Sequence, residues 1–102
     1  MAQFDVFRNP RGGIYPRVVD VQAEVHSRLA TRIVAPLVAR ARYAAQPLTR
    51  LTPVLKVRGD DHVVVFPLLA AVPRASLGEL VGSLAGERAA LIAALDLLIA
   101  GS

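Results

Sequence analysis

The sequence consists of a series of short apolar runs followed by one terminal stretch whose apolar residues recur at helical spacing. Valine and isoleucine dominate the runs, and proline, glycine, asparagine and aspartate separate them, as is typical of strands joined by turns. After residue 83 the apolar positions follow a period of about 3.6 residues instead. Strands followed by a single helix predict a mostly β (α+β) fold, in which a small barrel or sheet accompanies that helix.

The composition indicates one folded domain that covers residues 1–102. Hydrophobic residues make up 54% of the chain and charged residues 20%, so enough apolar surface is available for one core. The absence of cysteine excludes disulfides, thiolate nucleophiles and cysteine-based zinc sites. The first residues lack the basic and apolar regions of a signal peptide, and no apolar run reaches membrane-spanning length. We therefore expect a cytoplasmic protein that does not enter a membrane.

Turn residues separate the expected strands. Residues 9–13 (NPRGG) should turn between the strands of a first hairpin, and residues 58–61 (RGDD) between those of a second. Pro36 has no N–H to donate, so we expect it at an edge or a bulge of its strand. The strands expected from this pattern are 4–7, 14–25, 31–38, 54–57, 62–66 and 68–72.

Alternation along the strand 14–25 predicts which of its side chains point toward the core. One face should carry the apolar side chains Val19, Val21, Ala23 and Val25, and the other face Asp20, Gln22 and Glu24. Most aromatic residues of a chain like this belong to the core or to strand pairs, which is our expectation for Phe4, Phe7 and Phe66. Tyr15 is the aromatic residue for which we keep a recognition function open.

The last stretch predicts a helix from Leu84 to about Ile99, with Ser83 as its N-cap. Leucines at 84, 91, 95 and 98 share one face, and the remaining apolar positions extend so far around the helix that it should be covered on more than one side. Ser76 and Glu79 fit a capping box, which predicts a short helical turn before Gly82.

The residues offer little chemistry for catalysis or metal binding. Asp60, Asp61 and His62 form the only tight cluster of potential metal ligands, and three adjacent residues rarely point at one ion. The serines lie in no G-x-S-x-G context, and the glycines lack the Lys-Ser/Thr ending of a phosphate-binding loop. We expect no catalytic residue, no metal and no cofactor, and hence a protein that is not an enzyme.

The charge favours an acidic partner. Twelve basic residues, eleven of them arginine, oppose eight acidic residues and give a net charge of +4. Such a balance suits either nucleic acid or an acidic protein segment. The arginines are dispersed without an aromatic ladder for base stacking, so a solvated basic surface is the simpler interpretation. A small basic barrel that binds nucleic acid directly stays open as an alternative.

Several short motifs occur here in the same order and near the same positions as in the CcdB toxins. They are Gln3-Phe4, residues 19–22 (VDVQ), residues 32–37 (RIVAPL) and residues 71–73 (AVP). The sequence resembles this family almost without gaps from Gln3 to Gly101. The resemblance implies an SH3-like five-stranded antiparallel barrel with a small three-stranded wing and a C-terminal α-helix, assembled as a homodimer.

The resemblance also implies a function, that of the toxin in a type II toxin–antitoxin system. In the family, paired C-terminal helices bind the GyrA subunit of DNA gyrase and trap the enzyme on cleaved DNA. An acidic, disordered tail of a CcdA-like antitoxin wraps and removes the toxin. The toxin contacts DNA only indirectly, through the antitoxin complex that autoregulates transcription.

Matching positions can be carried over residue by residue. The implied gyrase-binding residues are Val25, His26, Asp96, Ile99, Ala100, Gly101 and Ser102, and the implied antitoxin-binding residues are Arg11 and Tyr15. Two departures stand out, because Ala100 replaces the family's tryptophan anchor and Ser102 replaces its terminal isoleucine. Buried aromatic anchors dominate interface energies. A second interpretation is therefore a degenerate or retargeted CcdB-fold interaction protein that binds antitoxin without poisoning gyrase.

Overall fold

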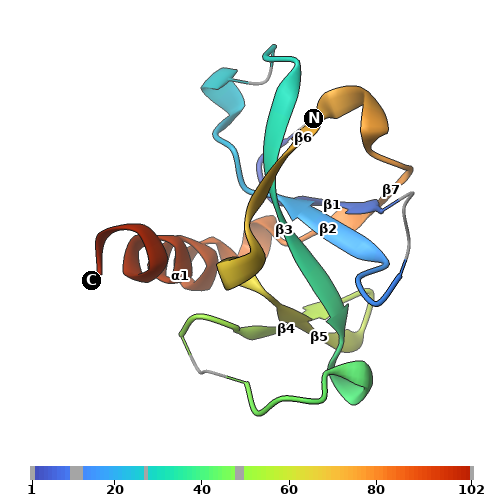
Figure 1. Cartoon of the computed structure of the whole chain (residues 1–102), viewed down its shortest axis with the longest axis vertical. Helices are drawn as coiled ribbons and strands as arrows, with labels where there is room; N and C mark the ends of the chain where they lie inside the picture. Colours follow the sequence, from blue (N-terminus) through green and yellow to red (C-terminus); the bar gives the residue numbers. More distant parts are fainter. Residues whose placement is uncertain (1, 10–12, 27, 48–49, 102) are drawn as a thin grey trace.

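A computed structural model describes residues 2–9, 13–26, 28–47 and 50–101. In these ranges the chain forms strands, short 3₁₀ turns and one α-helix (Figure 1). The strands are β1 (Asp5–Arg8), β2 (Arg17–Asp20), β3 (Thr31–Ala39), β4 (Val54–Val57), β5 (Asp60–Val64), β6 (Ala70–Pro73) and β7 (Leu80–Ser83). The 3₁₀ turns are η1 (Glu24–His26), η2 (Arg40–Arg42), η3 (Phe66–Leu68), η4 (Arg74–Ser76) and η5 (Ala85–Glu87), and the helix is α1 (Arg88–Ala100).

The strands pair in one antiparallel sheet that curls into a half barrel. Its order is β4-β5-β3-β2-β1-β7, and β6 pairs with β3 beside this path. Figure 1 shows β3 running through the middle of the molecule, with β6 along its upper half and the β4–β5 hairpin at its lower end. Curling brings the two ends of the sheet together, since Val57 and Arg58 lie about 4 Å from the side-chain position of Gly82 in β7. The expected mostly β fold with one C-terminal helix is confirmed.

The core lies between the concave face of the sheet and one face of α1. Phe4 and Phe66 are buried in one cluster with Leu37, Leu84 and Leu91, as the sequence predicted for its phenylalanines and helix leucines. Within α1 only Leu91 and Ala94 are buried. The cover that we expected on further sides of the helix is not supplied by this single chain.

Pro36 lies inside the sheet, which corrects the expectation of an edge or a bulge. β3 pairs with β2 along one side, and along the other side first with β6 and then with β5. The carbonyl of Pro36 accepts the N–H of Val65 at 2.8 Å, so its nitrogen faces the same side. On that side, β3 pairs with β6 as far as Val34 and with β5 from Leu37 onward. Pro36 therefore lies between the two pairings, at a position where neither strand needs its missing N–H.

The second hairpin is confirmed, but its turn is shorter than predicted. Val57 pairs with Asp60, so the turn is formed by Arg58 and Gly59 alone, while Asp60 and Asp61 belong to β5. Both turn residues have positive φ, 53° and 87°, as a type I′ hairpin turn requires.

The strand expected over residues 14–25 is wrong at both ends, since β2 covers only Arg17–Asp20. The Asp20 carboxylate accepts the N–H of Gln22 at 3.0 Å, which turns the chain out of the sheet before η1. Alternation ends there as well: Asp20 is fully buried beside Val19, and Val25 is exposed.

The capping box at Ser76 and Glu79 is also wrong. Helical turn η4 ends at Ser76, whose hydroxyl donates to the carbonyl of Pro73 at 2.7 Å. The chain then continues into β7, a strand the sequence did not predict, which pairs with β1. Ser83 ends this strand, and its hydroxyl accepts the N–H of Ala85 at 3.1 Å, so it caps η5 while α1 itself begins at Arg88.

Candidate functional site

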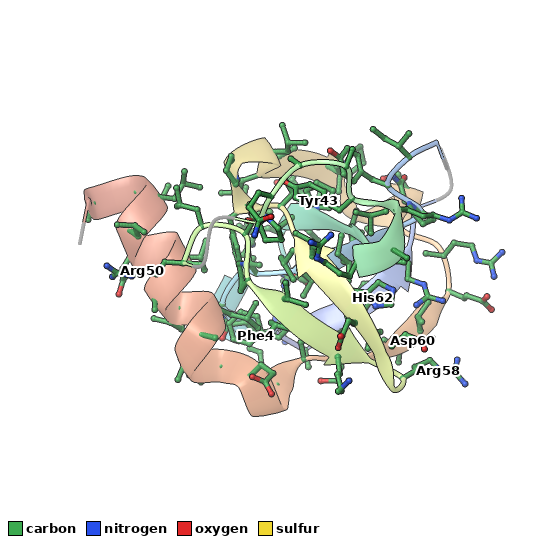
Figure 2. The ribbon with its side chains drawn as sticks, turned by 90° about the horizontal axis from the view of Figure 1, so that it is seen from below. Phe4, Tyr43, Arg50, Arg58, Asp60 and His62 are labelled. Carbon is green, nitrogen blue, oxygen red and sulfur yellow. The ribbon has the colours of Figure 1, made fainter. Side chains whose placement is uncertain are left out.

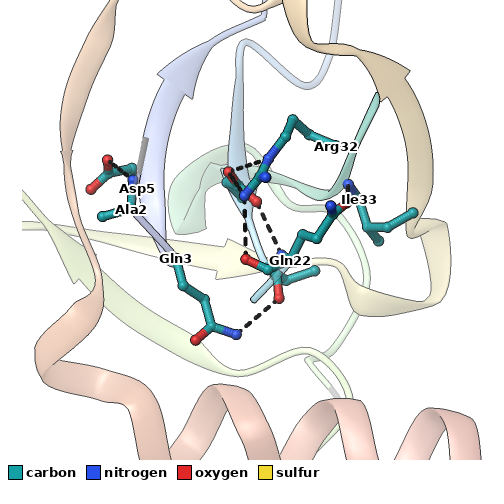
Figure 3. Close-up of polar contacts among 8 residues, drawn as sticks. Ala2, Gln3, Asp5, Gln22, Arg32 and Ile33 are labelled. Atoms are coloured by element: carbon teal, nitrogen blue, oxygen red, sulfur yellow. Dashed lines mark hydrogen bonds and ion pairs between the residues drawn. The ribbon is translucent and has the colours of Figure 1, made fainter. Parts of the chain in front are cut away.

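A buried polar network connects the segments that carry the family resemblance (Figure 3). Arg32 approaches Asp20 with Nε at 2.9 Å and Nη2 at 2.7 Å from the same carboxylate oxygen, and both side chains are fully buried. Arg32 also donates to the carbonyl of Gln22 at 3.3 Å, and the Gln22 side chain accepts the N–H of Ile33 at 3.1 Å. These contacts join the end of β2 to the start of β3. The VDVQ and RIVAPL motifs therefore hold the fold together.

The same network reaches the helix through Gln3. The Gln3 amide donates to the carbonyl of Val21 at 3.1 Å, and its oxygen accepts a hydrogen bond of 2.7 Å from Arg88 at the start of α1. The Arg88 guanidinium also lies 5.8 Å from the centre of the Phe4 ring, within cation–π range. These contacts position the first turn of α1 against the sheet, and with it the direction in which the helix projects.

The far end of α1 projects away from the sheet (Figure 1). Asp96 and Ala100 are exposed there, and Ile99 is 72% exposed. Gly101 ends the helix in the left-handed region with φ 80°, and its N–H donates to the carbonyl of Leu97 at 3.1 Å. These four predicted gyrase-binding residues thus form one helix tip. Ser102 lies outside the described residues.

Val25 and His26 lie on a different part of the chain. They belong to η1, which precedes β3 and lies at the top of Figure 1, apart from the free end of α1. The Val25 side chain is 83% exposed. The His26 side chain lies outside the described part of the structure. One chain alone therefore does not bring the predicted gyrase-binding residues into a single surface.

Tyr15 lies in the connection between β1 and β2. It is half-buried, and its carbonyl accepts a hydrogen bond of 2.9 Å from the Asn9 side chain. It lines a groove of about 630 Å³ whose other walls include Pro36, Val72 and Leu77. Arg11, its predicted companion in antitoxin binding, lies outside the described residues.

A second, larger cavity gathers arginines that are scattered in the sequence. Its volume is about 1360 Å³, and it opens where β7 faces the β4–β5 hairpin. The arginines that line it are Arg8, Arg17, Arg40, Arg42 and Arg58. Sequence reasoning treated these residues as dispersed surface charge, because they come from different segments and share no local signal.

His62 lies at the edge of this cavity and has a structural explanation. It is buried, its Nε2 lies 3.3 Å from Nη1 of Arg17, and its Nδ1 lies 2.9 Å from the carbonyl oxygen of Asp60. Since a guanidinium only donates, Nε2 is the acceptor and Nδ1 carries the proton. Across the described ranges, no three histidine, aspartate or glutamate side chains gather in a way that could hold a metal ion. No helix among the described residues is long and apolar enough to cross a membrane.

The curled sheet carries a projecting helix tip with exposed apolar residues and a cavity lined by arginines. These features are typical of a protein that binds other macromolecules. The family model described as CcdB protein matches residues 3–101. The chain therefore belongs to the CcdB family, the gyrase-poisoning toxins of toxin–antitoxin systems. These toxins are not enzymes, and their partners are an antitoxin and the GyrA subunit of DNA gyrase. A search of curated proteins finds no match to the chain.

Proposed function

We propose that this toxin acts in the cytoplasm as a homodimer whose paired α1 tips bind the GyrA subunit of DNA gyrase and trap cleaved DNA. The observation that carries this proposal is the exposed end of α1, where Ile99 keeps 72% of its surface accessible on a projecting helix. Exposed apolar residues at one projecting tip are typical of an interaction site. Asp96, Ala100, Gly101 and Ser102 complete the contact.

A homodimer would unite the two separate parts of the gyrase contact. The elements η1, η3 and α1 lie along the same side of the molecule in Figure 1, and each carries an exposed apolar side chain: Val25, Leu68 and Ile99. A second copy related by a two-fold axis would cover this side and place two helix tips next to each other. Val25 and His26 of one protomer would then flank the tip of its partner.

For the antitoxin we propose a contact around Tyr15 and Arg11, at the groove beside β6. Its apolar walls suit the alternating apolar side chains of a bound segment, which would become ordered on binding. The antitoxin would bind and release the toxin at this groove. This exchange would change the amount of toxin–antitoxin complex on DNA, and with it the autoregulation of transcription.

The decisive experiment adds purified toxin to gyrase of its own host and measures supercoiling inhibition together with cleaved DNA. We expect cleaved complexes to accumulate with wild-type protein and to be reversed by antitoxin. Inhibition of supercoiling without cleaved DNA would contradict the trapping mechanism. The absence of both effects at tens of micromolar toxin, an affinity limit of about 7 kcal/mol, would remove gyrase as the target.

One observation favours a second candidate function, that of a retargeted interaction protein. Ala100 stands at the position of the family's tryptophan, and the chain contains no tryptophan at all. Loss of an aromatic anchor at a hot spot costs about 2 kcal/mol or more of binding free energy. Under this alternative the protein dimerises and binds antitoxin but leaves gyrase unaffected, a combination that the same assay together with an antitoxin pull-down would identify.

A further inference from the structure

The cavity between β7 and the β4–β5 hairpin carries an excess of positive charge that the fold does not use. Among the described residues, five arginines and three carboxylates, Asp60, Asp61 and Glu79, line it. Two of the carboxylates already have partners: Glu79 pairs with Arg8 at 2.9 Å, and Asp61 pairs with Lys56, which does not line the cavity, at 2.9 Å. Of the described carboxylates that line the cavity, this leaves Asp60 alone to balance the charge of Arg17, Arg40, Arg42 and Arg58.

None of these four arginines forms an ion pair with a described residue. Arg17 donates to the neutral imidazole of His62, and Arg40 donates to the carbonyl of Tyr43 at 3.3 Å, contacts that orient the guanidinium groups without neutralising them. Within the described ranges Arg42 and Arg58 make no hydrogen bond or ion pair through their side chains. Figure 2 shows Arg58, Asp60 and His62 following one another along the hairpin, on the side away from α1.

The walls also have an apolar component. Ile14 and Leu80 are 76% and 60% exposed, and Val81 lies next to Leu80 on β7. β7 ends the sheet and pairs only with β1 among the described strands. A ligand that fits this cavity therefore combines spaced negative charges with apolar groups.

We propose that this cavity binds an acidic peptide segment, with carboxylates on Arg42, Arg58 and their neighbours and apolar side chains on Leu80 and Ile14. Arginine forms bidentate hydrogen bonds with carboxylates, and uncompensated guanidinium groups speed the approach of a negatively charged chain. The proposal deepens the antitoxin partnership of the proposed function and rests on it, since an antitoxin is the partner that supplies such a segment. It places this contact beside the β4–β5 hairpin, on the side of the molecule away from α1 (Figure 2).

A nucleic acid is the other polyanion to consider, and the cavity fits it less well. Single strands bind by stacking their bases on aromatic side chains. The one aromatic ring that lines the cavity among the described residues, that of His62, is buried. The carboxylates of Asp60, Asp61 and Glu79 would also repel a continuous row of phosphates, whereas a peptide can present neutral residues to them.

The test measures binding of a short fluorescein-labelled peptide in which glutamate alternates with valine, by fluorescence anisotropy. The cavity variant is Arg42→Gln/Arg58→Asn, because asparagine tolerates the positive φ of the turn. The control variant is Arg28→Gln/Arg50→Gln, which removes two exposed arginines outside the cavity. We expect the cavity variant to bind at least about tenfold more weakly, about 1.4 kcal/mol, and the control variant to bind like wild type.

Equal losses in both double variants would show that only the overall charge matters and would overturn the proposal. An oligonucleotide that loses affinity in the cavity variant, while the peptide does not, would assign the cavity to nucleic acid and overturn it as well. Gyrase cleavage is measured on the same proteins and should be unchanged, since neither arginine lies in α1 or η1. If wild-type protein leaves gyrase unaffected but the peptide result holds, the gyrase proposal fails and the cavity proposal stands.

Discussion

Arg32 and Asp20 form an ion pair of 2.7 Å in which neither side chain retains any contact with solvent. Twelve residues separate them in sequence, and they meet because β2 and β3 are antiparallel neighbours. The Asp20 carboxylate also accepts the backbone N–H of Gln22, and Arg32 also donates to the Gln22 carbonyl. Each charged group therefore has a further polar partner. Both residues belong to the motifs that carry the family resemblance. These motifs therefore contribute to the stability of the fold.

Replacing Arg32 by methionine should lower the free energy of unfolding by about 3–5 kcal/mol, because it leaves the Asp20 carboxylate buried without a partner. Urea titration at a fixed protein concentration measures this. The double variant Asp20→Asn/Arg32→Met should recover part of the loss, since the asparagine oxygen can still accept the N–H of Gln22.

The matched control is Lys56→Met, which breaks the exposed Lys56–Asp61 pair. Exposed pairs contribute at most about 1 kcal/mol, so its unfolding midpoint should hardly move. A loss of similar size in Arg32→Met and Lys56→Met would show that the buried pair has no special importance.

Gly78 should resist substitution by alanine for a steric reason. A Cβ at this position would lie 2.7 Å from the backbone oxygen of Arg8, which accepts the N–H of Gly78. Moving one backbone segment should cost about 1–3 kcal/mol and lower Tm by at least several degrees. Gly86→Ala is the control, because no atom lies within 4 Å of its Cβ position and Tm should stay within a few degrees. Equal melting temperatures for the two variants would refute the steric argument.

Ile99→Ser should abolish or strongly reduce gyrase cleavage while Tm changes little, since the Ile99 side chain is mostly exposed in the single chain. Cleavage assays and thermal unfolding of the same samples test this. Val54→Thr, which changes an exposed side chain on β4, should leave cleavage unchanged. Deleting Gly101 and Ser102 should likewise impair growth inhibition without unfolding the protein. A lower Tm in parallel with lost cleavage would point to a structural effect instead.

Replacing Arg11 and Tyr15 together by alanine should weaken antitoxin binding and leave the dimer intact. Tyr15 lines the groove beside β6, and of the three apolar side chains that we assign to the dimer, Val25, Leu68 and Ile99, only Leu68 also lines this groove. Isothermal titration calorimetry with the antitoxin gives the affinity, and sedimentation gives the oligomeric state. Unchanged affinity would remove these two residues from the antitoxin contact.

Local features of the sequence were sufficient for part of the fold. The strand over residues 31–38, the hairpin around Gly59 and the C-terminal helix were predicted because alternation, turn residues and helical periodicity act over a few neighbouring residues. The capping box failed for the corresponding reason. Pairing of β7 with β1, more than seventy residues away in sequence, outweighed the local preference at Ser76 and Glu79.

By itself the sequence determined the fold class, the helix and, through its ordered motifs, the family. Only the tertiary structure placed Asp20 in the core, because burial of a carboxylate depends on the distant arginine that compensates it. Only the tertiary structure separated Val25 from the helix tip and gathered five scattered arginines around one cavity. The curl of the sheet sets both arrangements, and it results from long-range strand pairing for which no short stretch of sequence carries a signal.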